Sequence, residues 1–149
     1  MPNEHKSSRV ITDLHPELAK RWLEMAEAFK RKHPSLPQPF LTQTYRSAED
    51  QNADYAKGRT VPGKVITNAK AGQSLHNFYP ALAFDVAFKD SYGHVSWQQD
   101  LFNKLGAIAL SVGLGWGGAW HGQFHDYPHF EPPNFTWHDA AAHTAPQWA

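Results

Sequence analysis

One short segment constrains the fold of this chain more than any other: the apolar run from Ala81 to Phe88, which contains a single acid, Asp85. A run of this length and composition predicts a strand that is buried on much of both faces. A carboxylate in such a strand is costly to bury unless it is paired or bound to a metal ion. The segment therefore predicts a sheet at the centre of a domain, with a polar site on that sheet.

Three other segments carry the signals of α-helices. Pro16 suits a first helical turn, and apolar residues recur after it at helical spacing. Ser47, with Asp50 three residues later, forms a capping box for a second helix, and Ser96 is expected to cap a third. The predicted helices cover residues 16–32, 48–57 and 97–112.

The remaining patterns predict strands and a long loop. Residues 40–45 alternate as a strand, and short strands joined by turns are expected between 114 and 131. Residues 59–73 have no sustained period and predict a surface loop, of a length that is uncommon unless the loop binds something. This order predicts an α+β domain with a small antiparallel sheet and about three flanking helices. We expect one domain over residues 1–149, with a core from about 10 to 136 and flexible termini.

Charge and composition exclude several classes of function. Fourteen basic and fourteen acidic side chains cancel, so no overall field favours nucleic acid or an anionic membrane. The absence of Cys excludes disulfide scaffolds, thiolate zinc fingers and cysteine nucleophiles. No stretch approaches the roughly 18 apolar residues that span a bilayer, and no apolar signal-peptide core follows Met1. We expect a protein made in the cytoplasm without a signal peptide, with no nucleic-acid or membrane partner.

Ten histidines are an excess for 149 residues, and they point to metal chemistry. Two imidazoles and one carboxylate form the ligand set of a catalytic zinc ion, which keeps its fourth position for water. The candidate ligands are His76, Asp85 and His129. Three further histidines compete with them: His121, His125 and His138. The first two precede His129 at helical spacing, but the Gly-rich and Pro-containing context disfavours a helix there.

An acid three residues before His129 is a candidate for proton transfer. With Pro128 in between, Asp126 and His129 could reach one cavity from an extended segment, where the carboxylate could take a proton from water and deliver it to a leaving amine. Read alone, each residue has an ordinary structural explanation, such as a turn position for Asp126. Read as a set, they favour a metal site.

At this point a resemblance to a known family becomes specific. The pattern Ser74-x-His76, Ala83-x-Asp85 and Asp126-x-x-His129 resembles the M15 zinc peptidases, which include D-alanyl-D-alanine carboxypeptidases, vancomycin-resistance D,D-dipeptidases and phage L-alanyl-D-glutamate endolysins. Further blocks that resemble the family are Thr44-Tyr45-Arg46-Ser47 followed by Gln51, then Lys57-Gly58-Arg59-Thr60, and Trp116-Gly117-Gly118-Ala119-Trp120. The resemblance covers about residues 40–132.

The resemblance implies a fold like that of the hedgehog domain and the D,D-peptidases. It also implies that a Zn²⁺ ion is bound by His76, Asp85 and His129. Asp126 would act as general base and then acid, while Arg46 would bind the substrate and stabilise the oxyanion. Ser74 would hydrogen-bond the substrate backbone or the residues around the site.

Two departures from the family pattern are visible. Eight residues lie between His76 and Asp85, whereas the family has six, so we expect a two-residue insertion at Tyr79-Pro80 that bulges while both ligands keep their places. The acid before His129 is Asp126 rather than Glu, which favours the endolysin branch.

The sequence therefore predicts a monomeric zinc peptidase that cuts the stem peptide of bacterial peptidoglycan. The favoured type is an L-alanyl-D-glutamate endopeptidase of a phage, held in the host cytoplasm until lysis and acting on the cell wall. The first alternative is a bacterial D-alanyl-D-alanine carboxypeptidase. The second, from another class, is a non-catalytic, zinc-stabilised module that binds the cell wall.

Overall fold

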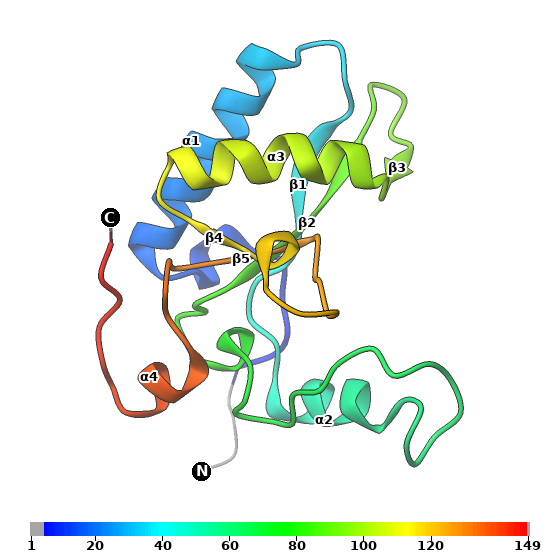
Figure 1. The fold of residues 1–149 in the computed structure, drawn as a ribbon, viewed down its shortest axis with the longest axis vertical. Coiled ribbons are helices and arrows are strands. Elements are labelled where there is room, and N and C mark those ends of the chain that lie inside the picture. Colours follow the sequence, from blue (N-terminus) through cyan, green and yellow to red (C-terminus); the bar gives the residue numbers. More distant parts are fainter. Residues whose placement is uncertain (1–4, 149) are drawn as a thin grey trace.

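The computed structural model describes residues 5–148 and has a small antiparallel sheet packed against two long helices (Figure 1). The sheet has the order β1-β2-β5-β4, and β3 pairs with the far end of β2. Its strands are β1 (Gln38–Gln43), β2 (Phe84–Lys89), β3 (Val95–Ser96), β4 (Gly115–Trp116) and β5 (His129–Glu131). The α-helices are α1 (Pro16–Lys32), α2 (Ala48–Ala56), α3 (Gln99–Ser111) and α4 (Trp137–Ala141). The predicted α+β class with a small antiparallel sheet is confirmed.

The two faces of the sheet differ because side chains alternate along a strand. Phe84, Val86 and Phe88 of β2 point to one face and are fully buried in the main core. Helices α1 and α3 cover this face, with ring contacts such as Trp22 to Phe84 and Phe102 to Phe88. Asp85, between two core residues, therefore points to the opposite face. This alternation separates the hydrophobic core from the polar site.

Helix α1 forms where the sequence predicts it. Pro16 occupies the first turn, and the His15 side chain accepts a hydrogen bond from the backbone N–H of Glu17. Its apolar stripe is buried against the sheet and α3, and it comprises Leu18, Trp22, Met25 and Phe29. Most of the stability of this helix comes from that packing.

Helix α2 and the loop that follows it lie at the other end of the molecule from α3 (Figure 1). The side-chain oxygen of Ser47 caps α2 by accepting from Asp50 N, as predicted. The second bond of the predicted capping box does not form, because Ser47 N donates to the Ser7 hydroxyl instead of to Asp50. Gly58 then adopts a φ of +78°, and a Cβ there would come within 2.6 Å of the backbone nitrogen of Val65. Residues 59–73 form neither helix nor strand, which confirms the predicted loop.

Several element boundaries differ from the prediction. Strand β2 begins at Phe84, because residues 81–83 leave the sheet and Ala81 instead pairs with Leu14. Helix α3 begins at Gln99 with Gln98 as N-cap, whereas Ser96 belongs to β3. Strand β1 ends at Gln43, two residues before the predicted end. Such shifts follow from pairing with distant strands, which local patterns do not encode.

The chain after residue 136 is more ordered than the sequence predicts. A reciprocal capping box between Thr136 and Asp139 begins α4, so residues 5–148 contain four α-helices where about three were expected. Ala140 is buried in a second, smaller core cluster. Flexible termini were predicted on both sides of a core at about residues 10–136, and for residues 1–4 and 149 that prediction lies outside the described residues. No helix within residues 5–148 is long and apolar enough to cross a membrane.

Candidate active site

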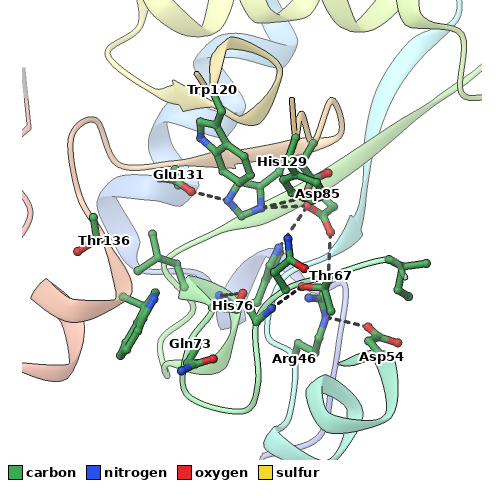
Figure 2. A pocket seen from close by; sticks show the side chains of 18 of the residues that line it. Arg46, Asp54, Thr67, Gln73, His76, Asp85, Trp120, His129, Glu131 and Thr136 are labelled. Carbon is green, nitrogen blue, oxygen red and sulfur yellow. Dashed lines mark hydrogen bonds and ion pairs between the residues drawn. The ribbon is translucent and has the colours of Figure 1, made fainter. Parts of the chain in front are cut away.

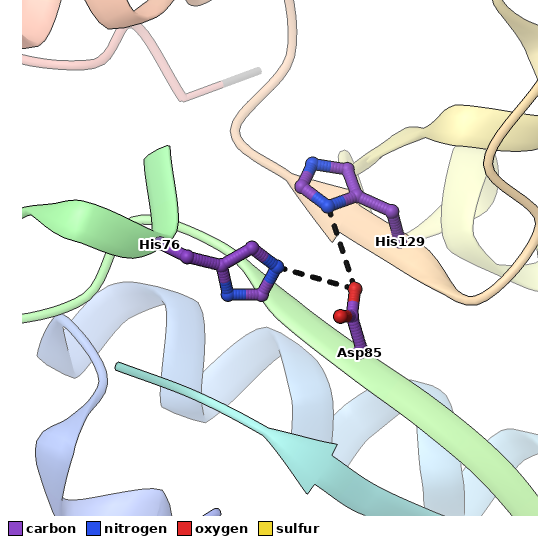
Figure 3. Close-up of side chains that lie close together, drawn as sticks. All are labelled: His76, Asp85 and His129. Atoms are coloured by element: carbon purple, nitrogen blue, oxygen red, sulfur yellow. Dashed lines mark hydrogen bonds and ion pairs between the residues drawn. The ribbon is translucent and has the colours of Figure 1, made fainter. Parts of the chain in front are cut away.

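Three side chains from distant parts of the chain converge on the polar face of the sheet (Figure 3). Asp85 on β2 lies directly opposite His129 on β5 in the antiparallel register, and His76 comes from a single 3₁₀ turn, Leu75–Asn77. Asp85 Oδ1 is 3.2 Å from His76 Nε2 and 3.4 Å from His129 Nδ1. One ligand atom from each residue lies within 4.8 Å of the other two. The predicted ligand candidates are therefore brought together.

The insertion between His76 and Asp85 leaves this convergence intact. Tyr79 and Pro80 are exposed and joined by a cis peptide bond, and the Tyr79 hydroxyl donates to Asp13 at 2.8 Å. The extra residues thus sit at the surface, while both His76 and Asp85 face the site, in agreement with the expected bulge.

The competing histidines do not join this group. In the part of the chain that the structure describes, the only set of three or more potential metal ligands is His76, Asp85 and His129. His125 Nδ1 instead lies 3.2 Å from the carbonyl of Gly118, and His138 stacks on Trp137.

Hydrogen bonds fix which ring nitrogen of His76 faces the site. Nδ1 of His76 is 2.7 Å from the carbonyl oxygen of Thr44, an atom that can only accept, so Nδ1 carries the proton. This leaves Nε2 as the nitrogen directed at Asp85. His76 and Thr44 are both buried, so water does not compete for this hydrogen bond. Ser74 caps the turn, because its hydroxyl accepts from His76 N at 3.3 Å.

His129 is held by a residue that was not among the predicted site residues. Its Nε2 lies 2.5 Å from a carboxylate oxygen of Glu131, and both side chains are largely buried. The two residues are separated by one position on β5, so they share a face of the strand. That spacing was a signal in the sequence, but it becomes informative only once residues 129–131 are known to form a strand.

The cluster is strongly coupled electrostatically. Burial disfavours a charged imidazolium at His129, but hydrogen bonds to Asp85 and Glu131 outweigh this and raise its pKa to about 10. Burial also disfavours the Asp85 carboxylate, yet the two neighbouring histidines hold its pKa well below the usual value. Asp85 is thus an anion that attracts cations, as a metal ligand must be.

Asp126 lies at the edge of this cluster and is partly exposed. One of its carboxylate oxygens is 4.0 Å from His129 Nδ1. Its backbone N–H donates to the carbonyl of Gly117 at 3.1 Å, which ties it to the turn after β4. Burial raises the pKa of Asp126 above that of an ordinary aspartate. A carboxyl group with a raised pKa is suited to taking up and releasing a proton.

Arg46 is fixed by several side chains around it. Its guanidinium donates to Gln43 at 2.8 Å and to Gln51 at 3.0 Å, and it lies 3.4 Å from Asp85 Oδ2. The pairing of β1 with β2 shifts register between Leu41 and Gln43, which brings Gln43 opposite Asp85. The fully buried Gln51 belongs to the block that resembles the family, but the sequence assigned it no role, because an amide inside a polar helix carries no distinctive pattern.

A cavity of about 550 Å³ is lined by the three candidate ligands together with Arg46, Asp126 and Glu131 (Figure 2). One side of it is formed by residues 66–69 of the long loop, and another by residues 135–137 just before and at the start of α4. Trp120 adds an aromatic surface, with its ring 5.2 Å from that of His129. The volume lies within the range that is usual for ligand-binding pockets.

This chain is similar in sequence to known peptidases and in fold to a solved one. A family model described as D-alanyl-D-alanine carboxypeptidase, one of the M15 peptidases, matches residues 67–132. The chain is similar to the peptidoglycan L-alanyl-D-glutamate endopeptidase CwlK of Bacillus subtilis (strain 168). The two are 31% identical over 131 residues, covering 82% of this chain and 75% of that protein. The fold resembles the crystal structure of the Serratia marcescens L-Ala D-Glu endopeptidase ChiX. The TM-score is 0.56 at 21% identity, with 87% of this chain and 86% of that chain covered.

Proposed function

This chain belongs to the M15 family of metal-dependent peptidases, and from that premise we propose that it is a zinc peptidase that hydrolyses the stem peptide of bacterial peptidoglycan. The observation that carries the proposal is the convergence of His76, Asp85 and His129 beside an acid and an arginine in one cavity. We further propose that residues 1–149 act as a single domain and a monomer.

The donor set fits zinc. Two imidazole nitrogens and one carboxylate oxygen are borderline and hard donors of the kind found in catalytic zinc sites, which leave one position open. The second nitrogen of each histidine is already bound to an acceptor, Thr44 or Glu131, as is typical of metal-binding histidines. His76, Asp85 and His129 would hold the ion. When bound, Zn²⁺ would polarise the scissile carbonyl and acidify a water molecule.

Three further residues would carry out the proton transfer and the binding of the substrate. The Asp126 carboxylate would accept the proton of the attacking water and pass it to the leaving amine, for which its raised pKa is suited. Arg46, held in place by Gln43 and Gln51, would present a fixed cation to a substrate carbonyl or carboxylate oxygen. Ser74 lines the same cavity and would contact the substrate backbone.

The favoured scissile bond is that between L-Ala and D-Glu. Both CwlK and ChiX carry this activity in their names, and Asp126 is the shorter acid that we associate with the endolysin branch. We propose a phage endolysin that reaches the cell wall at lysis. The match to a family model described as D-alanyl-D-alanine carboxypeptidase keeps that reaction as the second candidate.

Mass spectrometry of digested peptidoglycan tests both which bond is cut and whether cleavage requires the metal ion. Purified peptidoglycan is incubated with the zinc-loaded protein, with the chelated protein and with Asp126→Asn. We expect new peptides with D-Glu at the N-terminus, lost on chelation and restored by zinc rather than by calcium or magnesium. Release of free D-Ala would instead support the carboxypeptidase. Binding without any cleavage would contradict a peptidase and support the cell-wall-binding module.

A further inference from the structure

Glu131 occupies a position from which it can act on the metal site without being a ligand. It follows His129 by two residues on β5, so both side chains lie on the polar face of the sheet, while Phe130 between them is buried in the core. The Glu131 side chain is only 16% exposed, which is low for a carboxylate. A buried carboxylate needs a partner, and His129 is that partner.

The local backbone leaves room for this carboxylate. Glu131 pairs with Gly115 of the neighbouring strand β4, and a Cβ on that glycine would lie 3.4 Å from Glu131 Cγ and 3.3 Å from the backbone oxygen of Pro132. A Cβ at 115 would press on the backbone just after Glu131, whereas its distance to Glu131 Cγ is an ordinary van der Waals contact. Gly115 therefore leaves space beside β4 for the Glu131 side chain.

The contact determines which nitrogen His129 offers to the site. A carboxylate oxygen only accepts hydrogen bonds, so the 2.5 Å contact requires a proton on His129 Nε2. Nδ1 then remains for the site, where it lies 3.4 Å from Asp85. His76 has the opposite arrangement, because the Thr44 carbonyl binds its Nδ1 and Nε2 faces Asp85. The two histidines therefore present different ring nitrogens, each selected by its own acceptor (Figures 2 and 3).

We propose that Glu131 is a positioning residue that locks His129 as an Nδ1 ligand and thereby sets the affinity of the site for its metal ion. This inference rests on the proposed metal-binding role of His129. At His76 the corresponding hydrogen-bond acceptor is the neutral carbonyl of Thr44. The carboxylate adds a negative charge that makes the His129 nitrogen a stronger electron-pair donor to a metal ion. A neutral backbone carbonyl adds no such charge.

Two substitutions of Glu131, compared with a control elsewhere, separate its effect on ring orientation from the effect of its charge. Glu131→Gln keeps a side-chain oxygen that can accept from Nε2 but removes the charge, whereas Glu131→Ala removes both. Glu27→Ala is the control, because Glu27 is an exposed carboxylate on α1 that pairs with Arg31. Zinc affinity is measured on each folded protein without substrate, by competition with a chromophoric chelator. We expect Glu131→Ala to weaken zinc binding by about 10- to 100-fold, Glu131→Gln by less, and Glu27→Ala not at all.

A second measurement reports on the tautomer directly. Nitrogen-15 NMR of the zinc-loaded, histidine-labelled protein should detect a protonated Nε2 and a metal-bound Nδ1 at His129 in the native chain and in Glu131→Gln. In Glu131→Ala the Nε2 proton should lose its protection from exchange. If Glu131→Ala misfolds, the Gln variant alone still gives both readouts.

Three outcomes would contradict this role. Unchanged zinc affinity in both variants, or a metal-bound Nε2 at His129 in the native protein, would overturn it. Unchanged affinity with a raised KM for peptide would instead identify Glu131 as a substrate contact and also overturn it. Because none of the binding measurements uses peptidoglycan, failure to cleave the cell wall would contradict the proposed function and leave this inference standing.

Discussion

The two sides of the cavity are built by different means. On the sheet side, Asp85 and His129 project from paired strands whose alternate residues are locked into the core. On the other side, residues 59–73 have neither strand nor helix and most of their side chains are exposed. The positions of Asp85 and His129 are therefore determined by strand pairing. A single substitution of an exposed residue does not disrupt that pairing. Position on the loop side depends on a few individual side chains.

This contrast suggests that the two sides of the cavity have different functions. Ligands for a metal ion must be held within a few tenths of an ångström. The paired strands provide that precision for Asp85 and His129, and a buried 3₁₀ turn that is hydrogen-bonded to Thr44 provides it for His76. A surface that contacts a substrate can be looser and can vary without destabilising the fold. Substitutions on the sheet side should consequently affect metal content and turnover, whereas those on the loop side should affect KM.

The largest effect is expected from Asp85→Asn. The change removes the anion shared by His76, His129 and Arg46 and leaves three potential cations facing one another. We expect loss of bound zinc and of detectable hydrolysis, measured by elemental analysis and peptide release. Near-native zinc content in the folded variant would show that the sheet side does not hold the ion.

Asp126→Asn should separate proton transfer from metal binding. We expect turnover to slow by about 10²- to 10⁴-fold, the usual contribution of a general acid–base group, with zinc content unchanged. Because the base must be ionised and burial raises the pKa of Asp126, native activity should fall with decreasing pH at a higher pH than an exposed aspartate would give. Loss of zinc along with activity would contradict this separation of roles.

Gly117→Ala tests whether the position of Asp126 matters. A Cβ at residue 117 would overlap the Asp126 backbone oxygen, so Asp126 must move. A displacement near 1 Å can cost about 10²-fold in rate, so we expect turnover to slow by about 10- to 100-fold, with zinc retained. Gly122→Ala is the comparison variant. A Cβ at residue 122 would meet nothing within 4 Å, so any change in turnover there reports only the strain of its positive φ. Equal turnover in the two variants would argue against the overlap as the cause.

The pH dependence of zinc binding should originate on the sheet side. Without an ion the pKa of His129 is about 10, so near pH 7 this residue must release a proton before it can act as a ligand. We expect zinc affinity to rise by about tenfold per pH unit between roughly pH 6 and 8, with at least one proton released per ion. Calorimetry in buffers of different ionisation enthalpy counts that proton. No proton release would show that His129 is already neutral near pH 7 before the ion binds, and would contradict its raised pKa.

The sequence predicted the candidate metal ligands better than it predicted the residues that hold them in place. Asp85 stood out because an acid in an apolar strand demands a partner, and α1 was predictable because Pro16 and its apolar stripe are local signals. Gln51, Glu131 and the Thr44 carbonyl could not be assigned, since their importance depends on which distant backbone lies beside them. The same reason explains the misplaced start of α3, where Ser96 is used by a strand pairing instead of a cap.

The smallest effect is expected on the loop side, from Arg59→Ala. The Arg59 guanidinium stacks on Tyr55 at 3.8 Å and donates to the backbone carbonyls of Tyr55 and Thr67, next to the loop residues that line the cavity. Its loss should loosen those residues and raise KM about two- to fivefold, matching the about 0.5–1 kcal/mol of an exposed cation–π contact. Zinc affinity and kcat should stay unchanged, as should all three parameters in the control Arg31→Ala, an exposed arginine on α1. A fall in zinc affinity in Arg59→Ala would mean that the loop supports the metal ligands after all, and the two sides of the cavity would then have to be treated as one unit.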